Sequence, residues 1–188
     1  MRRFALFTAA LALVVAACDR PAPPPPVAAA DAGTPVDLDV MAFLSEARSL
    51  HHEANVHEND RDDKGAIVAL EKLENAARPH PEKKIPEVEE VLADTYARSA
   101  EIRLRTGDVD GAAKDVEQGT THAEGDSYFH GHLLEVGGIV EEARAASLAD
   151  AGKSEAADAA KKKALALLGQ AVKIQDQVIG ASLDGGTR

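Results

Sequence analysis

The stretch that decides the fold is Gly107-Asp108-Val109-Asp110-Gly111-Ala112. A related stretch, Asp62-Asp63-Lys64-Gly65-Ala66, begins 46 residues before Asp108. A third, Lys153-Ser154-Glu155-Ala156-Ala157, begins 45 residues after it. Self-similarity at a nearly fixed spacing is the sequence signature of a repeat architecture. We therefore expect three copies of one structural unit.

The same spacing relates small residues on either side of each turn. Each unit has one alanine twelve positions before another, namely Ala54 and Ala66, Ala100 and Ala112, and Ala145 and Ala157. Two closely packed antiparallel helices need small side chains where their backbones cross, because those side chains set the distance between the axes. The pattern predicts a helical hairpin in each unit.

Apolar residues at helical spacing predict six helices. The first runs from about Asp37 to a break at 59–64, and the second covers 67–77. The third runs from Pro86 to Gly107, and the fourth begins near Asp108 and weakens at 119–121. The fifth covers about 126–149 and the sixth about 154–179. The expected core stripe of the first helix is Met41, Leu44, Ala47, Leu50 and Ala54; that of the sixth is Leu167, Ala171, Ile174 and Val178, broadened by Leu165, Leu168 and Val172. No alternating apolar run is long enough for a strand, so the expected fold class is all-α.

The middle unit resembles a known repeat. Its turn, Gly107 to Ala112, is similar to the Gly-Asp-x-Asp/Glu-x-Ala turn of the tetratricopeptide repeat, and Tyr96 and Ala100 fall where that repeat has an aromatic and a small residue. The period of 45–46 exceeds the family's ~34, Arg103 stands where an aromatic is usual, and Gly119 stands where alanine is usual. The resemblance implies three hairpins in a tetratricopeptide-like right-handed array with longer first helices.

Arrays of this kind present a concave groove lined by their first helices. We expect Leu50, His57, Tyr96 and Arg103 to face such a groove. The resemblance implies a protein-protein interaction scaffold whose partner is an unidentified protein or peptide. The pattern leaves the oligomeric state open.

The N-terminus has the pattern of an export signal. Residues 1–17 begin Met1-Arg2-Arg3 and continue as an apolar run that is too short for a membrane-spanning helix. Val15-Ala16-Ala17-Cys18 resembles the lipobox of bacterial lipoproteins, and Cys18 is the chain's single cysteine. The resemblance implies cleavage before Cys18, acyl chains on Cys18 and a membrane anchor facing the periplasm. Asp19 resembles an inner-membrane retention signal in that family, and this slightly favours the inner over the outer membrane.

A tether separates this anchor from the helical body. Residues 18–36 contain Pro23-Pro24-Pro25-Pro26 among alanines, and proline has a fixed φ and no N–H to donate, so a disordered linker is expected. The expected domains are therefore the signal peptide (1–17), the lipidated cysteine and linker (18–36), the helical repeat domain (37–181) and a disordered tail (182–188).

The charge excludes some partners. The formal net charge is -11, and removing the leader would remove Arg2 and Arg3 and no acid. A body this acidic repels nucleic acid and anionic lipid surfaces. No nucleophile motif or phosphate-binding glycine loop is present, so neither an enzyme nor a cofactor is expected.

Two acidic turns suggest calcium as an alternative. Asp60, Asp62 and Glu71 occupy ligand positions of a twelve-residue calcium loop, as do Asp108, Asp110 and Glu117. Each loop lacks one ligand, and the repeat turn explains both without a metal. Zinc is a further possibility, but His52 and His57 are five residues apart and so do not share a helix face. The alternative function is a self-contained helical bundle with a calcium, zinc or structural role.

Overall fold

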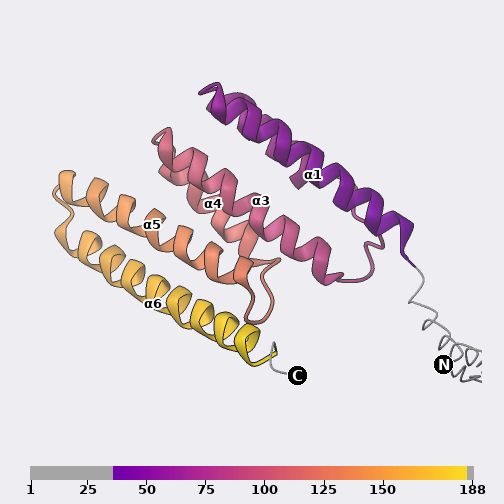
Figure 1. The fold of residues 1–188 in the computed structure, drawn as a ribbon. Coiled ribbons are helices and arrows are strands. Elements are labelled where there is room, and N and C mark those ends of the chain that lie inside the picture. Colours follow the sequence, from indigo (N-terminus) through magenta and orange to yellow (C-terminus); the bar gives the residue numbers. More distant parts are fainter. Residues whose placement is uncertain (1–35, 186–188) are drawn as a thin grey trace, which may run out of the picture. The chain divides into compact units, whose positions relative to one another are not determined.

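The computed structural model describes residues 36–185, which form six α-helices and no strand (Figure 1). The helices are α1 (Leu38–Asn59), α2 (Asp63–Glu74), α3 (Pro86–Arg105), α4 (Val109–Thr120), α5 (Tyr128–Asp150) and α6 (Ser154–Gly185). The all-α class and the six helices are thus confirmed. α6 continues past residue 181, where the repeat domain was expected to end. The expected signal peptide, lipobox and nearly all of the linker lie outside the described residues, as do residues 186–188.

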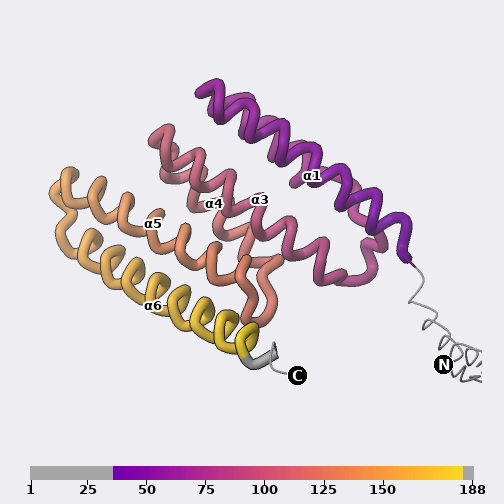
Figure 2. The backbone as a smooth tube through the Cα atoms, viewed as in Figure 1, coloured from indigo at the N-terminus to yellow at the C-terminus, as the bar shows by residue number. Residues whose placement is uncertain are grey.

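The helices pair in chain order. α1 packs against α2, α3 against α4 and α5 against α6, and three residues connect the helices of each pair. The smooth trace in Figure 2 shows the sharp reversals at these connections. α3 lies at the centre, because it also contacts α1, α2 and α5. Three antiparallel hairpins thus follow one another, joined by the longer segments 75–85 and 121–127.

The three hairpin turns have the same backbone structure. Each contains one left-handed residue at an equivalent position, Arg61 (φ 60°), Gly107 (φ 85°) or Gly152 (φ 72°). The next residue donates its N–H to a carbonyl five residues back, at 2.8, 2.8 and 2.9 Å respectively. This is the Schellman geometry, which satisfies the last free carbonyls of a helix. The repeat seen in the sequence is therefore also a repeat of hydrogen bonds.

The second helix of the first two hairpins begins with an aspartate cap. Asp62 accepts a hydrogen bond from the Gly65 N–H, and Asp108 accepts one from the Gly111 N–H, each at 2.9 Å. A carboxylate at this position stabilises a helix by about 1 kcal/mol, because it pairs with an N–H that otherwise has no partner in the helix. The third turn has Lys153 there, so its helix begins without this cap.

The core is built mainly from small and aliphatic side chains. All six alanines expected at the helix crossings are buried, namely Ala54, Ala66, Ala100, Ala112, Ala145 and Ala157. Ala54 and Ala66 share one hydrophobic cluster, and Ala100 and Ala112 share another. The predicted role of small residues at the hairpin crossings is confirmed for these positions.

Three apolar residues that were expected in the core are exposed instead. In α1 the buried side chain is Phe43, and Met41 is exposed. In α6, Leu165 and Val172 are exposed, because α6 packs against α5 alone among the described helices and so has only one side covered. The periodicity identified the helices correctly but overestimated how much of each helix is buried.

None of the described helices could cross a membrane. α6 is the longest, at 32 residues, but its four lysines and four acidic residues interrupt the apolar run. Within residues 36–185 no helix is both long and apolar enough for a span.

Candidate partner-binding groove

The central helix α3 carries a stripe of charged side chains on one side. Asp94, Arg98, Glu101 and Arg105 are spaced by four, three and four residues. Residues three or four apart are neighbours on a helix surface. This stripe lies between the two other first helices, because Asp94 and Arg98 contact side chains of α1 while Asp94 and Glu101 contact a side chain of α5.

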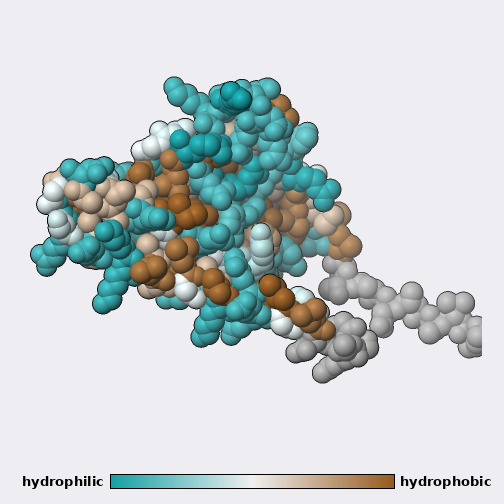
Figure 3. All heavy atoms as spheres, turned by 60° about the vertical axis from the view of Figure 1, so that its left-hand side comes forward, coloured by the Kyte–Doolittle hydropathy of each residue, from teal (hydrophilic) through white to brown (hydrophobic). Residues whose placement is uncertain are grey.

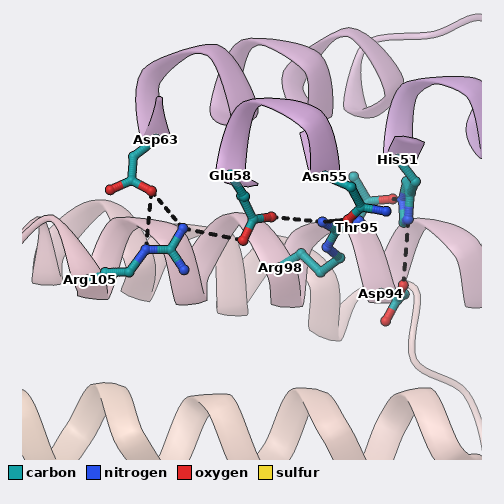
Figure 4. Close-up of polar contacts among 8 residues, drawn as sticks. All are labelled: His51, Asn55, Glu58, Asp63, Asp94, Thr95, Arg98 and Arg105. Carbon is teal, nitrogen blue, oxygen red and sulfur yellow. Dashed lines mark hydrogen bonds and ion pairs between the residues drawn. The ribbon is translucent and has the colours of Figure 1, made fainter. Parts of the chain in front are cut away.

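Two arginines of this stripe are held by the first hairpin (Figure 4). Arg98 donates to Asn55 and to Glu58 at 2.8 Å each. Arg105 donates to Asp63 at 2.6 Å and to Glu58 at 3.3 Å. Glu58 therefore bridges both guanidinium groups, one with each carboxylate oxygen. These pairs fix the register between α1 and α3 and hold both arginines in defined positions.

A groove opens beside these ion pairs. It has a volume of about 350 Å³ and is lined by Asn55, Glu58, Asn59, Arg98, Glu101, Ile102 and Arg105. All but one of these side chains are polar, and Ile102 forms an apolar floor that is itself buried. A surface with fixed donors and acceptors and little apolar area suits an extended polar segment of a partner rather than an apolar small molecule.

A histidine of α5 extends the charged stripe. His132 Nε2 lies 3.3 Å from Glu101, and its Nδ1 lies 3.5 Å from Asp94, at the limit of a hydrogen bond and with no closer acceptor. These carboxylates, Asp94 first, raise the pKa of His132 to about 10. His132 is therefore charged at neutral pH and adds a cation between α3 and α5.

His51 of α1, on the other side of the charged stripe from His132, is neutral at pH 7. Thr95 donates its hydroxyl to the Val91 carbonyl at 2.7 Å, so His51 Nε2 is the donor in the 2.9 Å contact with Thr95. Burial, reinforced by the nearby Arg98, lowers the pKa of His51. The 3.8 Å approach of its Nδ1 to Asp94 is thus not an ion pair at neutral pH.

Two of the residues expected in the groove lie on the other side of α3. Tyr96 stacks on His122 with ring centroids 5.6 Å apart. Arg103 donates to Asp115 of α4 at 2.7 Å and to Glu71 of α2 at 2.8 Å. At 100° per residue both lie roughly 180° from Asp94 around the helix. Arg103 connects the first two hairpins, whereas Tyr96 packs on the segment that follows α4, and neither residue lines the first-helix groove.

The remaining two expected residues are engaged in local structure. Leu50 is buried in the core cluster with Phe43 and Leu73. His57 Nδ1 contacts Asp62 at 2.9 Å, beside the first turn. The four residues expected to form one surface therefore belong to separate contact sets.

The acidic turns use most of their carboxylates for the fold. Asp62 and Asp108 cap α2 and α4 as described, and Glu71 pairs with Arg103. Asp110 approaches Arg144 at 3.7 Å, while Asp60 and Glu117 are exposed. In the described part of the chain, the one trio of His or acidic side chains close enough to share an ion is Asp37, Asp39 and His80. Asp37 already accepts from two N–H groups at the start of α1.

Sequence reasoning missed a half-buried carboxyl between α2 and α3. Ser99 donates to Glu74 at 2.6 Å, and burial raises the pKa of Glu74 to about 7. Asp115, which is buried, has a raised pKa for the same reason, opposed by Arg103. Arg103 is thus the cation shared by Glu71 and Asp115. Its position in the repeat, where an aromatic residue is usual, does not indicate this role.

Comparisons with protein-family models, curated proteins and solved structures found no match to this chain. What the protein does is therefore inferred from its own residues and their geometry.

Proposed function

We propose that this protein is a lipid-anchored envelope protein whose helical body binds a protein partner through the groove on its first helices. Its role is binding rather than catalysis. The observation that carries the proposal is the charged groove between α1 and α3, in which Arg98 and Arg105 are held in place by Glu58.

The proposed arrangement of the body is a right-handed, tetratricopeptide-like array. Two features support it. The three hairpin turns have a residue of left-handed backbone conformation at the equivalent position, and the same hydrogen bonds, at spacings of 46 and 45 residues. Each hairpin also buries a pair of alanines at equivalent positions. In such an array the first helices line one face, which is where the charged stripe of α3 lies.

The groove suits recognition because its charged groups are already ordered. An arginine that is fixed by a neighbouring carboxylate loses less rotamer freedom when a partner binds. Both signs of charge are present, since Arg98 and Arg105 alternate with Asp94 and Glu101 along the helix. Alternating charge favours a partner segment with a complementary pattern, and it disfavours nucleic acid, which presents a single sign.

The proposed anchor is Cys18. The lipobox-like Val15-Ala16-Ala17-Cys18 supports it, and the proline-rich segment up to residue 36 would separate the lipid from the body. Stable anchoring requires at least two acyl chains, because a single chain binds a bilayer with an association constant of only ~10⁴ M⁻¹. Asp19 slightly favours retention at the inner membrane, with the body on the periplasmic side.

The binding proposal is tested with charge reversal in the groove. Glu101 is exposed and lines the groove, so Glu101→Lys reverses a charge there. The variant also loses the 3.3 Å contact with His132, so its helical content is checked by circular dichroism. The matched control is Glu142→Lys, on an exposed position of α5 that does not line this groove. The full chain is immobilised and the recovery of envelope proteins is compared. We expect Glu101→Lys to reduce recovery of a specific partner about tenfold, equivalent to ~1.4 kcal/mol, and Glu142→Lys to leave it unchanged. Equal recovery by all three proteins would reject the groove as the binding surface.

A further inference from the structure

One flank of α6 carries a row of exposed aliphatic side chains. Leu165, Val172 and Ile179 are seven residues apart and 73, 57 and 58 % exposed, and Leu183 is 70 % exposed. Residues seven apart lie on the same side of a helix, with a drift of only ~20° per step. In Figure 3, hydrophobic residues form a broken row of brown patches along the lower edge of the helical body, where α6 lies.

This row is not used by the fold. A different side of α6, about 100° around the helix from this row, packs against α5 and buries Ala164, Ala171 and Ile174. From Leu165 to Leu183 the row is ~27 Å long at 1.5 Å per residue. The last unit of a repeat array normally has a polar outer face, because an apolar face there causes association. Helices that pair with one another have two apolar positions in every seven residues, and the row supplies one of these two.

The charge of α6 sets it apart from the other helices. It carries Lys161, Lys162, Lys163 and Lys173 against four acidic residues, so its formal charge is zero. Each of the other five described helices has more acidic than basic residues. Two copies of a chain with net charge -11 repel each other over most of their surface. α6 is the helix at which that repulsion is smallest.

We propose that α6 binds α6 of a second copy of this chain, antiparallel about a two-fold axis at Val172. The row is symmetric about Val172, since Leu165 and Ile179 each lie seven residues away. A two-fold axis there places Val172 against its own counterpart and Leu165 against Ile179 of the second copy, so the patch is self-complementary. The interface does not depend on the proposed partner groove, which lies on α1 and α3.

The charges favour the antiparallel direction. Lysines 161–163 give the first half of α6 a net positive charge, whereas Asp176 and Asp184 give the second half a net negative charge. An antiparallel pair places opposite halves together and also aligns the helix dipoles favourably. Leu183 then lies near Lys161 of the second copy, whose alkyl stem covers apolar surface while its ammonium stays in water.

Single cysteines test both the face and its symmetry. In the full chain in detergent, Cys18→Ser removes the one native thiol, and one cysteine is then introduced at a time. Oxidised glutathione joins only thiols whose Cβ atoms approach to about 3.5–4.5 Å. We expect Val172→Cys to form a covalent dimer with itself. Leu165→Cys alone should not do so, but a mixture with Ile179→Cys should form the mixed dimer. Val68→Cys, at an exposed apolar position of α2, measures random collision.

Two results would overturn the proposal. Self-linking of Leu165→Cys as fast as that of Val172→Cys would show a parallel pair, and linking of all variants at the Val68→Cys rate would show no interface at this face. Analytical ultracentrifugation measures the molecular mass in solution as a second readout. At about 100 μM protein, a dimer that dissociates with a Kd of about 1 μM is almost fully formed. The Cys18→Ser chain and its Val68→Glu variant should be dimers, and Val172→Glu should be a monomer. A dimer in all three would assign association to another segment, such as the apolar residues 4–17, and a monomer in all three would exclude dimerisation.

Discussion

Replacing Arg103 with leucine tests whether one partly buried cation holds the first two hairpins together. Arg103 is the shared partner of Glu71 on α2 and Asp115 on α4, with contacts of 2.8 and 2.7 Å, and it approaches Asp108 at 3.4 Å. Leucine keeps part of the packing volume but removes all three interactions. Asp115, which is almost buried, would then have no cation to offset its loss of hydration.

The magnitude follows from how buried this group is. Removing one partner of a fully buried ion pair costs about 3–5 kcal/mol, because a charge is left unpaired. The Arg103 and Asp115 side chains are 24 and 12 % exposed, so water partly compensates. We therefore expect Arg103→Leu to lower the free energy of unfolding by about 2–3 kcal/mol at pH 7. Adding Asp115→Leu should recover part of this loss, since the unpaired carboxylate is removed.

Urea denaturation followed by circular dichroism measures the effect. The matched control is Arg105→Leu, which also removes ion pairs, to Glu58 and Asp63, but from a side chain that is half exposed. Exposed pairs are worth only about 0.2–1 kcal/mol. If Arg103→Leu cost no more than Arg105→Leu, the description of Arg103 as the cation linking the hairpins would be refuted.

Four further substitutions test the half-buried acid, a helix crossing and two turns. Burial raises the pKa of Glu74 to about 7, so the folded chain holds a proton that the unfolded chain releases, and the free energy of unfolding falls as pH rises from about 4.5 to about 7. Glu74→Gln should therefore raise the free energy of unfolding by about 1–3 kcal/mol at pH 8 and change it little at pH 4. An equal effect at both pH values would disprove this. Ala112→Leu inserts three carbons into a contact with no exposed surface and should cost about 1–3 kcal/mol, whereas an unchanged melting temperature would place Ala112 at the surface. Arg61 has a left-handed φ of 60°, so Arg61→Gly should stabilise the first turn by about 0.5–1 kcal/mol, while Gly107→Ala, at the equivalent position, should destabilise the second.

The sequence was sufficient to predict the hairpins because their signals are local. A glycine or aspartate turn and a pair of alanines twelve residues apart report directly on backbone conformation and on how closely two helices approach. Arg61 shows the limit of this approach, since it occupies the left-handed position that Gly107 and Gly152 hold in the other turns. The turn geometry is set there by the Schellman hydrogen bonds rather than by glycine.

The orientation of each helix in the array could not be predicted in the same way. Tyr96 and Arg103 were expected to line the groove, but Tyr96 stacks on His122, just after α4, and Arg103 contacts α2 and α4. Periodicity identifies residues that share a face but does not say which neighbour that face meets. The stripe of Asp94, Arg98, Glu101 and Arg105 is charge at helical spacing, but its partners in α1 and α5 lie 31 to 47 residues away in the sequence.

The exposed residues of α6 show a second limit. Leu165 and Val172 were expected in the core because they widen an apolar stripe, and they lie in solvent because no described helix covers that side. An apolar pattern indicates that a face of a helix is suited to apolar contacts, but it does not show whether the contact is within the chain or with another molecule. For Leu165 and Val172 we infer a contact with a second copy of the chain.

The most direct test of the central claim places a photo-crosslinking amino acid at position 101, in the groove, within the full chain in intact cells. Position 142, on an exposed part of α5, serves as the control. A partner bound in the first-helix groove should give a discrete crosslinked species at position 101, absent at 142 and lost when Asn59, which lines the same groove, is changed to arginine. Crosslinks of equal yield at 101 and 142, or none at 101 in cells that express the protein, would contradict the claim that this groove is a binding surface.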